Sequence, residues 1–161
     1  MYLSKNLIIK FIILSSLLTF FTFSKSVANL VKPNNGIEPI QVVKIQLRGL
    51  KTNDEPYKDV GIEQTWEFAH PRNKMATGPL PRFTNMIKTP AYSILLNNLK
   101  FETKEIFNDG TNAGIAVRIE AQDNKAYTYM WSLEKIQDDG PLKNNWMTTG
   151  VSGPRLLAEG S

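Results

Sequence analysis

The spacing of hydrophobic residues changes once along this chain, between residues 96 and 99. Before that point, apolar residues recur at intervals of three and four, as they do along one face of an α-helix. From Leu99 onward they alternate with polar residues, which is the period of a strand with one buried face. Helices first and strands afterwards are typical of an α+β domain rather than a parallel α/β domain.

Three helices are predicted before the change. The apolar stripe of the first consists of Ile40, Val43, Leu47 and Leu50. Pro39 suits its first turn, where a missing N–H costs nothing. The stripe of the third, short helix consists of Leu80, Phe83, Met86 and Ile87.

The second helix repeats the helical spacing with Ile62, Trp66 and Ala69. Asp59 is its expected N-cap. Pro71 requires the helix to end one or two residues earlier, because the residue before a proline disfavours helical backbone. Trp66 is expected to pack in the core.

Four strands of an antiparallel meander are predicted, over residues 99–107, 113–121, 127–134 and 146–151. Short runs of Asn, Asp and Gly separate them and suit tight turns. The aromatic and aliphatic residues of the two central strands share one face, so Glu120 and Glu134 are expected on the other. No strand carboxylate is then available on the buried face to act as a general base.

The first 28 residues have the layout of a secretory signal peptide. Lys5 and Lys10 precede or flank an apolar run over 11–23, and Ser26-Val27-Ala28 supplies small residues for cleavage. The run is shorter than the ~18 residues expected of a membrane span. We expect export to the periplasm or the thylakoid lumen. The alternative is an uncleaved N-terminal helix that anchors the protein to the membrane, which is the one membrane contact we expect.

This pattern divides the chain into a signal peptide over 1–28, a linker over 29–37, one α+β domain over 38–152 and a flexible tail over 153–161. Three of the 19 basic residues fall in the leader, so the rest of the chain carries 16 basic and 15 acidic residues. Such a near-neutral domain lacks the field of a nucleic-acid binder. There is no cysteine and a single histidine, so we expect no metal and no cofactor.

Helices followed by a four-stranded meander, with Trp146 on the last strand, resemble the NTF2-like, cystatin-like cone superfamily across residues 38–151. Four stretches also resemble an uncharacterised domain-of-unknown-function family of bacteria and photosynthetic organisms: Gly61-Ile62-Glu63-Gln64, Ala69-His70-Pro71-Arg72-Asn73, Thr77-Gly78-Pro79 and Arg82-Phe83. The superfamily resemblance implies a cone in which the curved sheet and the long helix line a pocket. Some members are isomerases or dehydratases with an Asp, Tyr or His in that pocket, and others bind ligands, dimerise or pair with other proteins.

Three residues are candidates for the pocket because of their chemistry. His70 titrates near neutral pH and is either a general base at the pocket mouth or a residue that closes the second helix. Tyr127 and Tyr129 either pack in the core or line the pocket, since each buried hydroxyl needs a partner.

A basic segment interrupts the balanced charge of the chain. No acid lies between Glu67 and Glu102, and the gap contains five basic residues, Arg72, Lys74, Arg82, Lys88 and Lys100. They form either a solvated face or a docking surface for an acidic protein, an anionic ligand or anionic lipid headgroups. Arg82, beside Phe83, is the strongest candidate because its planar guanidinium suits carboxylate or phosphate.

The acid-free inner face and the basic segment favour an exported module that binds a small-molecule ligand or an acidic protein partner and catalyses nothing. The alternative is a small-molecule isomerase or dehydratase that uses His70 or a tyrosine as its acid or base. A homodimer joined through the exposed face of the sheet is a third hypothesis.

Overall fold

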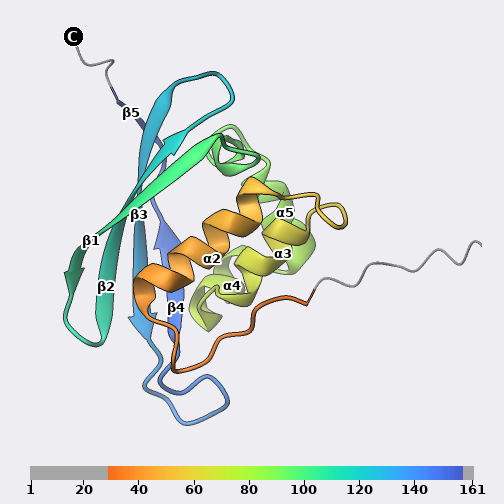
Figure 1. Cartoon of the computed structure of the whole chain (residues 1–161). Coiled ribbons are helices and arrows are strands. Elements are labelled where there is room, and N and C mark those ends of the chain that lie inside the picture. Colours follow the sequence, from red (N-terminus) through yellow and green to blue (C-terminus); the bar gives the residue numbers. More distant parts are fainter. Residues whose placement is uncertain (1–28, 158–161) are drawn as a thin grey trace, which may run out of the picture.

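The computed structural model describes residues 29–157, and Figure 1 shows their arrangement. The predicted signal peptide and the last residues of the predicted tail lie outside the described residues. Within 29–157, no helix combines the length and the apolar character needed to cross a membrane.

The helical layer of the described chain contains four helices. They are α2 (Pro39–Lys51), α3 (Val60–Glu67), α4 (Pro71–Thr77) and α5 (Leu80–Ile87), followed by the short 3-10 helix η1 (Ser93–Leu95). A proline stands in the first turn of α2, α4 and α5, where its missing N–H breaks no helical hydrogen bond. The first and third predicted helices are confirmed as α2 and α5.

The region of the second predicted helix contains two helices instead of one. α3 ends at Glu67, and α4 begins at Pro71. α4 has no buried residue and therefore no apolar stripe for a periodicity argument to detect. Pro71 was expected only to stop a helix, whereas it also starts the next one.

Asp59 stands at the predicted N-cap of α3, but its role differs from the prediction. Its backbone is left-handed, with φ of 65°, and its side chain makes no capping hydrogen bond. The carboxylate instead accepts hydrogen bonds from Lys88 Nζ at 2.6 Å and Asn53 Nδ2 at 3.2 Å. Asp59 therefore ties the start of α3 to the end of α5.

The sheet is antiparallel and curved, and its four main strands lie in chain order (Figure 1). They are β1 (Lys100–Asn108), β2 (Asn112–Glu120), β3 (Ala126–Lys135) and β4 (Trp146–Val151). The predicted α+β class and the four-stranded antiparallel meander are confirmed. The short β5 (Arg155–Leu156), within the segment expected to be a tail, pairs with the first part of β3 beyond the end of β4.

The core lies between the helices and one face of the sheet, which α2 crosses (Figure 1). The register places Val117 opposite Tyr129 and Ile115 opposite Trp131, and all four side chains are buried. The carboxylates Glu120 and Glu134 lie on the other face, as expected from the alternation, and form ion pairs with Arg118 and Arg72.

The edge of β4 is covered by the break between α3 and α4. Thr148 N donates to the Phe68 carbonyl at 2.8 Å, and His70 N donates to the Thr148 carbonyl at 2.8 Å. These bonds satisfy backbone groups that an open edge would expose. They also fix the break between α3 and α4 beside the middle of β4, where the candidate site lies.

Candidate ligand cavity

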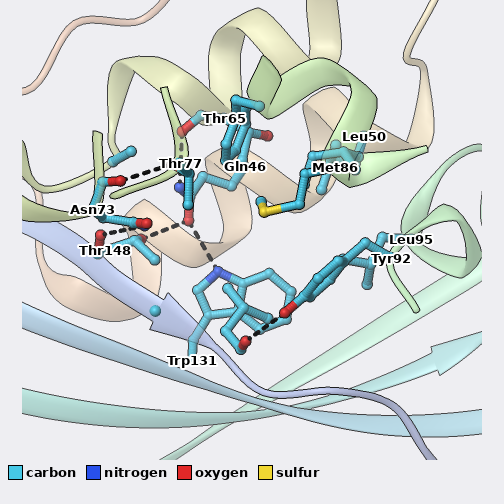
Figure 2. Close-up of a pocket in the computed structure, with 15 residues that line it drawn as sticks. Gln46, Leu50, Thr65, Asn73, Thr77, Met86, Tyr92, Leu95, Trp131 and Thr148 are labelled. Atoms are coloured by element: carbon cyan, nitrogen blue, oxygen red, sulfur yellow. Dashed lines mark hydrogen bonds between the residues drawn. The ribbon is translucent and has the colours of Figure 1, made fainter. Parts of the chain in front are cut away.

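A cavity of about 160 Å³ lies between the helices and the sheet (Figure 2). α2 contributes Gln46 and Leu50 to its wall, β3 contributes Trp131, and the remaining lining residues come from the α3–η1 region and from β4. Protein interiors rarely contain voids larger than a water molecule, so a space of this size needs an explanation.

A network of hydrogen bonds centred on Gln46 forms the polar end of the cavity (Figure 2). Gln46 is 1% exposed. Its Oε1 accepts from Trp131 Nε1 at 3.1 Å and from Thr148 Oγ1 at 2.9 Å. Its Nε2 donates to the Thr65 carbonyl at 3.1 Å. The amide is thereby held in one orientation, and each of the bonded groups avoids the cost of burial without a partner.

The polar end continues to the rim of the cavity through two half-buried residues of α4. Asn73 Nδ2 donates to the Thr148 carbonyl at 3.3 Å, and Thr77 Oγ1 donates to the Asn73 carbonyl at 2.7 Å. Within the described chain, Asn73 Oδ1 accepts no hydrogen bond. A carbonyl oxygen is therefore available at the rim to accept a hydrogen bond from a guest molecule.

The other end of the cavity is apolar. Figure 2 shows Leu50, Met86, Leu95 and Tyr92 on the side away from Asn73 and Thr77. The Tyr92 hydroxyl donates to the Val151 carbonyl at 3.1 Å, which links η1 to the end of β4 at the rim. The cavity thus has an apolar end and a hydrogen-bonding end.

No charged side chain lines the cavity in the part of the chain that the structure describes, and Tyr92 is the one ionisable residue in its wall. A charged guest would lose its hydration there without gaining an ionic partner, which is costly in free energy. The lining therefore suits a neutral guest. It also contains no carboxylate or imidazole that could work as a paired general acid and base.

Comparisons with protein-family models, with curated proteins and with solved structures found no significant match. The assignment of a function therefore depends on the geometry of the chain itself.

Phe83 is the one residue of the sequence-predicted site that lines this cavity. Tyr129 is buried beside Trp131, and its hydroxyl donates to the Ala91 carbonyl at 3.0 Å. Burial raises the pKa of Tyr129. The Tyr127 hydroxyl donates to Asp123 Oδ2 at 3.0 Å, at the turn before β3. The structure places neither tyrosine in the cavity wall.

The five basic side chains of the basic segment lie outside the cavity wall, and most of them have partners. Arg72 pairs with Glu134, Lys88 with Asp59 at 2.6 Å, and Lys100 with Glu102 at 2.8 Å. Lys74 Nζ lies 5.4 Å from the centre of the Trp66 ring, and burial lowers its pKa. Arg82 is exposed and forms no ion pair within the described residues.

His70 lines a second groove, of about 440 Å³, together with Arg72, Glu134 and Asp138. It caps the start of α4, where its Nδ1 accepts a hydrogen bond from the Arg72 backbone N–H at 3.1 Å. The expectation that His70 closes the second helix is therefore corrected. A ring nitrogen that accepts this bond must be unprotonated, so the capping role requires neutral imidazole.

We expect the stability of the protein to fall as pH decreases through about 6.5, because of His70. Burial first, and then the charge of Arg72, hold the pKa of His70 below its ordinary value, while Glu134 and Asp138 act in the opposite direction. The unfolded chain therefore binds this proton at a higher pH than the folded chain, and the stabilisation present above pH 6.5 is lost as pH falls toward the folded pKa. Urea unfolding at several pH values between 7.5 and 5 measures the effect.

His70→Asn is the control for this titration, because asparagine also caps helices but does not ionise. The variant is expected to flatten the pH dependence above pH 5. Carboxylates with lowered pKa values, such as Asp109 with a pKa of about 2, change the stability of the protein only at more acidic pH. An unchanged slope in the variant would contradict the assignment to His70.

Four polar residues of the cavity wall were not predicted from the sequence: Gln46, Asn73, Tyr92 and Thr148. One signal for Gln46 was present: it lies three residues after Val43 and four before Leu50, on the apolar stripe of the first helix. A polar side chain on a buried stripe indicates a specific hydrogen-bonding role. Asn73 could not be found in this way, because α4 carries no stripe.

Proposed function

We propose that this chain is an exported NTF2-like cone that binds a small neutral molecule in the cavity and catalyses no reaction on it. The order of helices and strands, and the position of α2 across the inner face of a curved sheet, support the cone. The layout of residues 1–28 in the sequence supports export.

The observation that carries the proposal is the cavity with its amphipathic and uncharged wall. A cavity of about 160 Å³ leaves the atoms that line it without packing partners on one side. A guest that fills the space recovers dispersion contacts with its lining. The volume matches the roughly 150 Å³ of an apolar cavity that takes up benzene.

The wall also specifies the kind of guest. Leu50, Leu95 and Met86 suit an apolar body about the size of one ring. The hydroxyls of Thr77 and Thr148 and the Oδ1 of Asn73 suit a hydroxyl or amide at the other end of the guest. His70 does not line this cavity, and the proposal gives it no catalytic role.

Benzyl alcohol and benzoate test the proposal, because the two probes share a ring and differ in charge. Benzyl alcohol is expected to shift the NMR signal of the Trp131 indole N–H, with a Kd of about 1 mM, as suits a ligand of this size. Benzoate is expected to bind at least about tenfold more weakly, because no cation lines the cavity. Equal shifts from both probes, or none from either, would contradict the proposal.

Replacing either of two native alanines by leucine distinguishes binding in the cavity from binding elsewhere. Ala69 lines the cavity, and Ala69→Leu is expected to fill it and to remove benzyl alcohol binding. Ala116 lies on the opposite face of the sheet, and Ala116→Leu is expected to leave binding unchanged. Circular dichroism checks that both variants are folded. Native mass spectrometry of the protein from its own host would then identify the natural guest.

A further inference from the structure

β1 is the open edge of the sheet. β2 pairs with one side of it, and no other described strand pairs with its second side. None of its nine residues is buried. The opposite edge differs, since the segment around Phe68 and His70 bonds to β4. An open edge exposes backbone N–H and C=O groups that can bond to a further strand.

The charges on β1 alternate in sign along its outer face. Phe101 and Thr103 are the half-buried residues of the strand, and Thr103 pairs with the buried Val117. Lys100, Glu102 and Lys104 therefore point to the opposite, outer face, because neighbouring residues of a strand alternate. The Lys100–Glu102 ion pair is exposed, so it contributes little stability and can exchange partners.

We propose that β1 is the interface of a homodimer, in which it pairs with β1 of a second copy, antiparallel about Thr103. Residues directly opposite in an antiparallel pair share a face and interact. Centred on Thr103, the pairing places Glu102 of each copy opposite Lys104 of the other, twice by symmetry. The sheets of the two copies then become one continuous sheet.

The charge pattern selects this register over its neighbours. A pairing centred on Glu102 would place two Glu102 side chains opposite each other and each Lys100 opposite a Lys104. A pairing centred on Lys104 would place the two Lys104 side chains opposite each other. Like charges directly opposite destabilise a strand pair. Charged edges block unselective pairing, and this pattern disfavours centres on Glu102 and Lys104. A centre on Phe101 would also place opposite charges together, Lys100 against Glu102, but it would not bring the apolar ends of the two strands together.

Exposed apolar side chains at both ends of β1 support the same arrangement. Leu99 is 45% exposed, and Ile106 and Phe107 are each 52% exposed. In the Thr103-centred register, the Leu99 end of one copy runs beside the Ile106–Phe107 end of the other. Two apolar clusters then flank the central charges and lose contact with water on association. The bulge between Glu105 and Phe107 limits the length of the pairing.

A charge-reversal series measured by analytical ultracentrifugation tests the dimer. The unmodified protein is expected to associate reversibly across a dilution series up to millimolar concentration. Glu102→Lys and Lys104→Glu are each expected to raise the dissociation constant at least about tenfold, because each places like charges opposite at two positions. Both side chains are exposed, so the melting temperature of each variant should stay within a few degrees of the original.

The two single variants also test the register. Mixed together, they present opposite charges to each other at both positions, so a heterodimer is expected from two poorly associating proteins. The double variant Glu102→Lys/Lys104→Glu is expected to restore the homodimer. A monomeric unmodified protein, or single variants that associate normally, would overturn the proposal. So would a dimer that dissociates with Met130→Lys, on the outer sheet face, but not with Lys104→Glu.

Discussion

Replacing Trp131 by alanine is expected to lower the free energy of unfolding by ~3–5 kcal/mol. Trp131 is 1% exposed and is the largest of the fully buried side chains. It contacts the cavity, lies 6.1 Å from the Tyr129 ring between centroids, and donates its indole N–H to Gln46. Its removal enlarges a cavity that already exists, and the surrounding strands can close such a space only in part. Urea unfolding followed by circular dichroism measures the change.

Trp131→Phe separates the ring from its hydrogen bond. Phenylalanine keeps an aromatic ring in the core but removes the donor to Gln46 Oε1, which still accepts from Thr148 Oγ1. We expect this variant to lose roughly 1–2 kcal/mol, for the hydrogen bond and a modest loss of volume. If Trp131→Ala and Trp131→Phe lowered the free energy of unfolding equally, the loss would come from the hydrogen bond to Gln46 and not from packing.

Gly61→Ala is expected to destabilise the protein by ~3 kcal/mol or more, because it forces α2 and α3 apart. A Cβ built on Gly61 would lie 2.0 Å from the Gly49 carbonyl oxygen and 2.9 Å from Asn53 Cα. Both are backbone atoms, which cannot rotate away as a side chain can. Asn53 also binds this end of α3, since its Oδ1 accepts from Ile62 N at 3.1 Å and its carbonyl from Gly61 N at 3.0 Å.

Gly153→Ala is the matched control for this substitution. A Cβ on Gly153 meets no atom within 4 Å, so alanine there should leave stability unchanged or raise it slightly by restricting the unfolded chain. Thermal unfolding of both variants gives the comparison. If the Gly61→Ala and Gly153→Ala proteins had the same melting temperature, α2 and α3 would be able to separate at little cost in free energy.

The polar network around Gln46 has a structural role beside the cavity. Gln46 joins α2 to α3, β3 and β4 through three hydrogen bonds, so the walls of the cavity are fixed without a side chain that fills it. A purely apolar wall would gain stability by collapsing into the space. The bonded amide resists that collapse, because a shift of any partner would leave a buried polar group unpaired.

Helices and strands with a clear hydrophobic periodicity could be predicted from the sequence, and those without it could not. The stripe from Ile40 to Leu50 specified α2, and the alternation through Ile115 and Val117 specified β2 and the side of the sheet that is buried. α4 was missed because none of its residues is buried. The two-residue β5 was missed because it is held by pairing with β3 and not by a pattern of its own.

The candidate site was mostly beyond the reach of the sequence. His70 and the five basic residues drew attention through their charge, yet none of them lines the cavity. The cavity wall consists of common residues such as Thr65, Thr77 and Thr148, whose chemistry is ordinary until they face one space. Their convergence depends on how three separate elements pack, and no local pattern records it.

The sequence by itself determined that helices precede a four-stranded antiparallel sheet, and it determined which face of that sheet is buried. It could do so because hydrophobic burial imposes a period on each element, whatever that element packs against. Only the tertiary structure decided that a cavity forms between α2 and β3, that Gln46 bonds Trp131 and Thr148 across 85 and 102 residues, and that β1 is left as an open edge. These features arise from the distances between elements, which depend on close approaches such as that of Gly49 and Gly61 and not on the period of any one element.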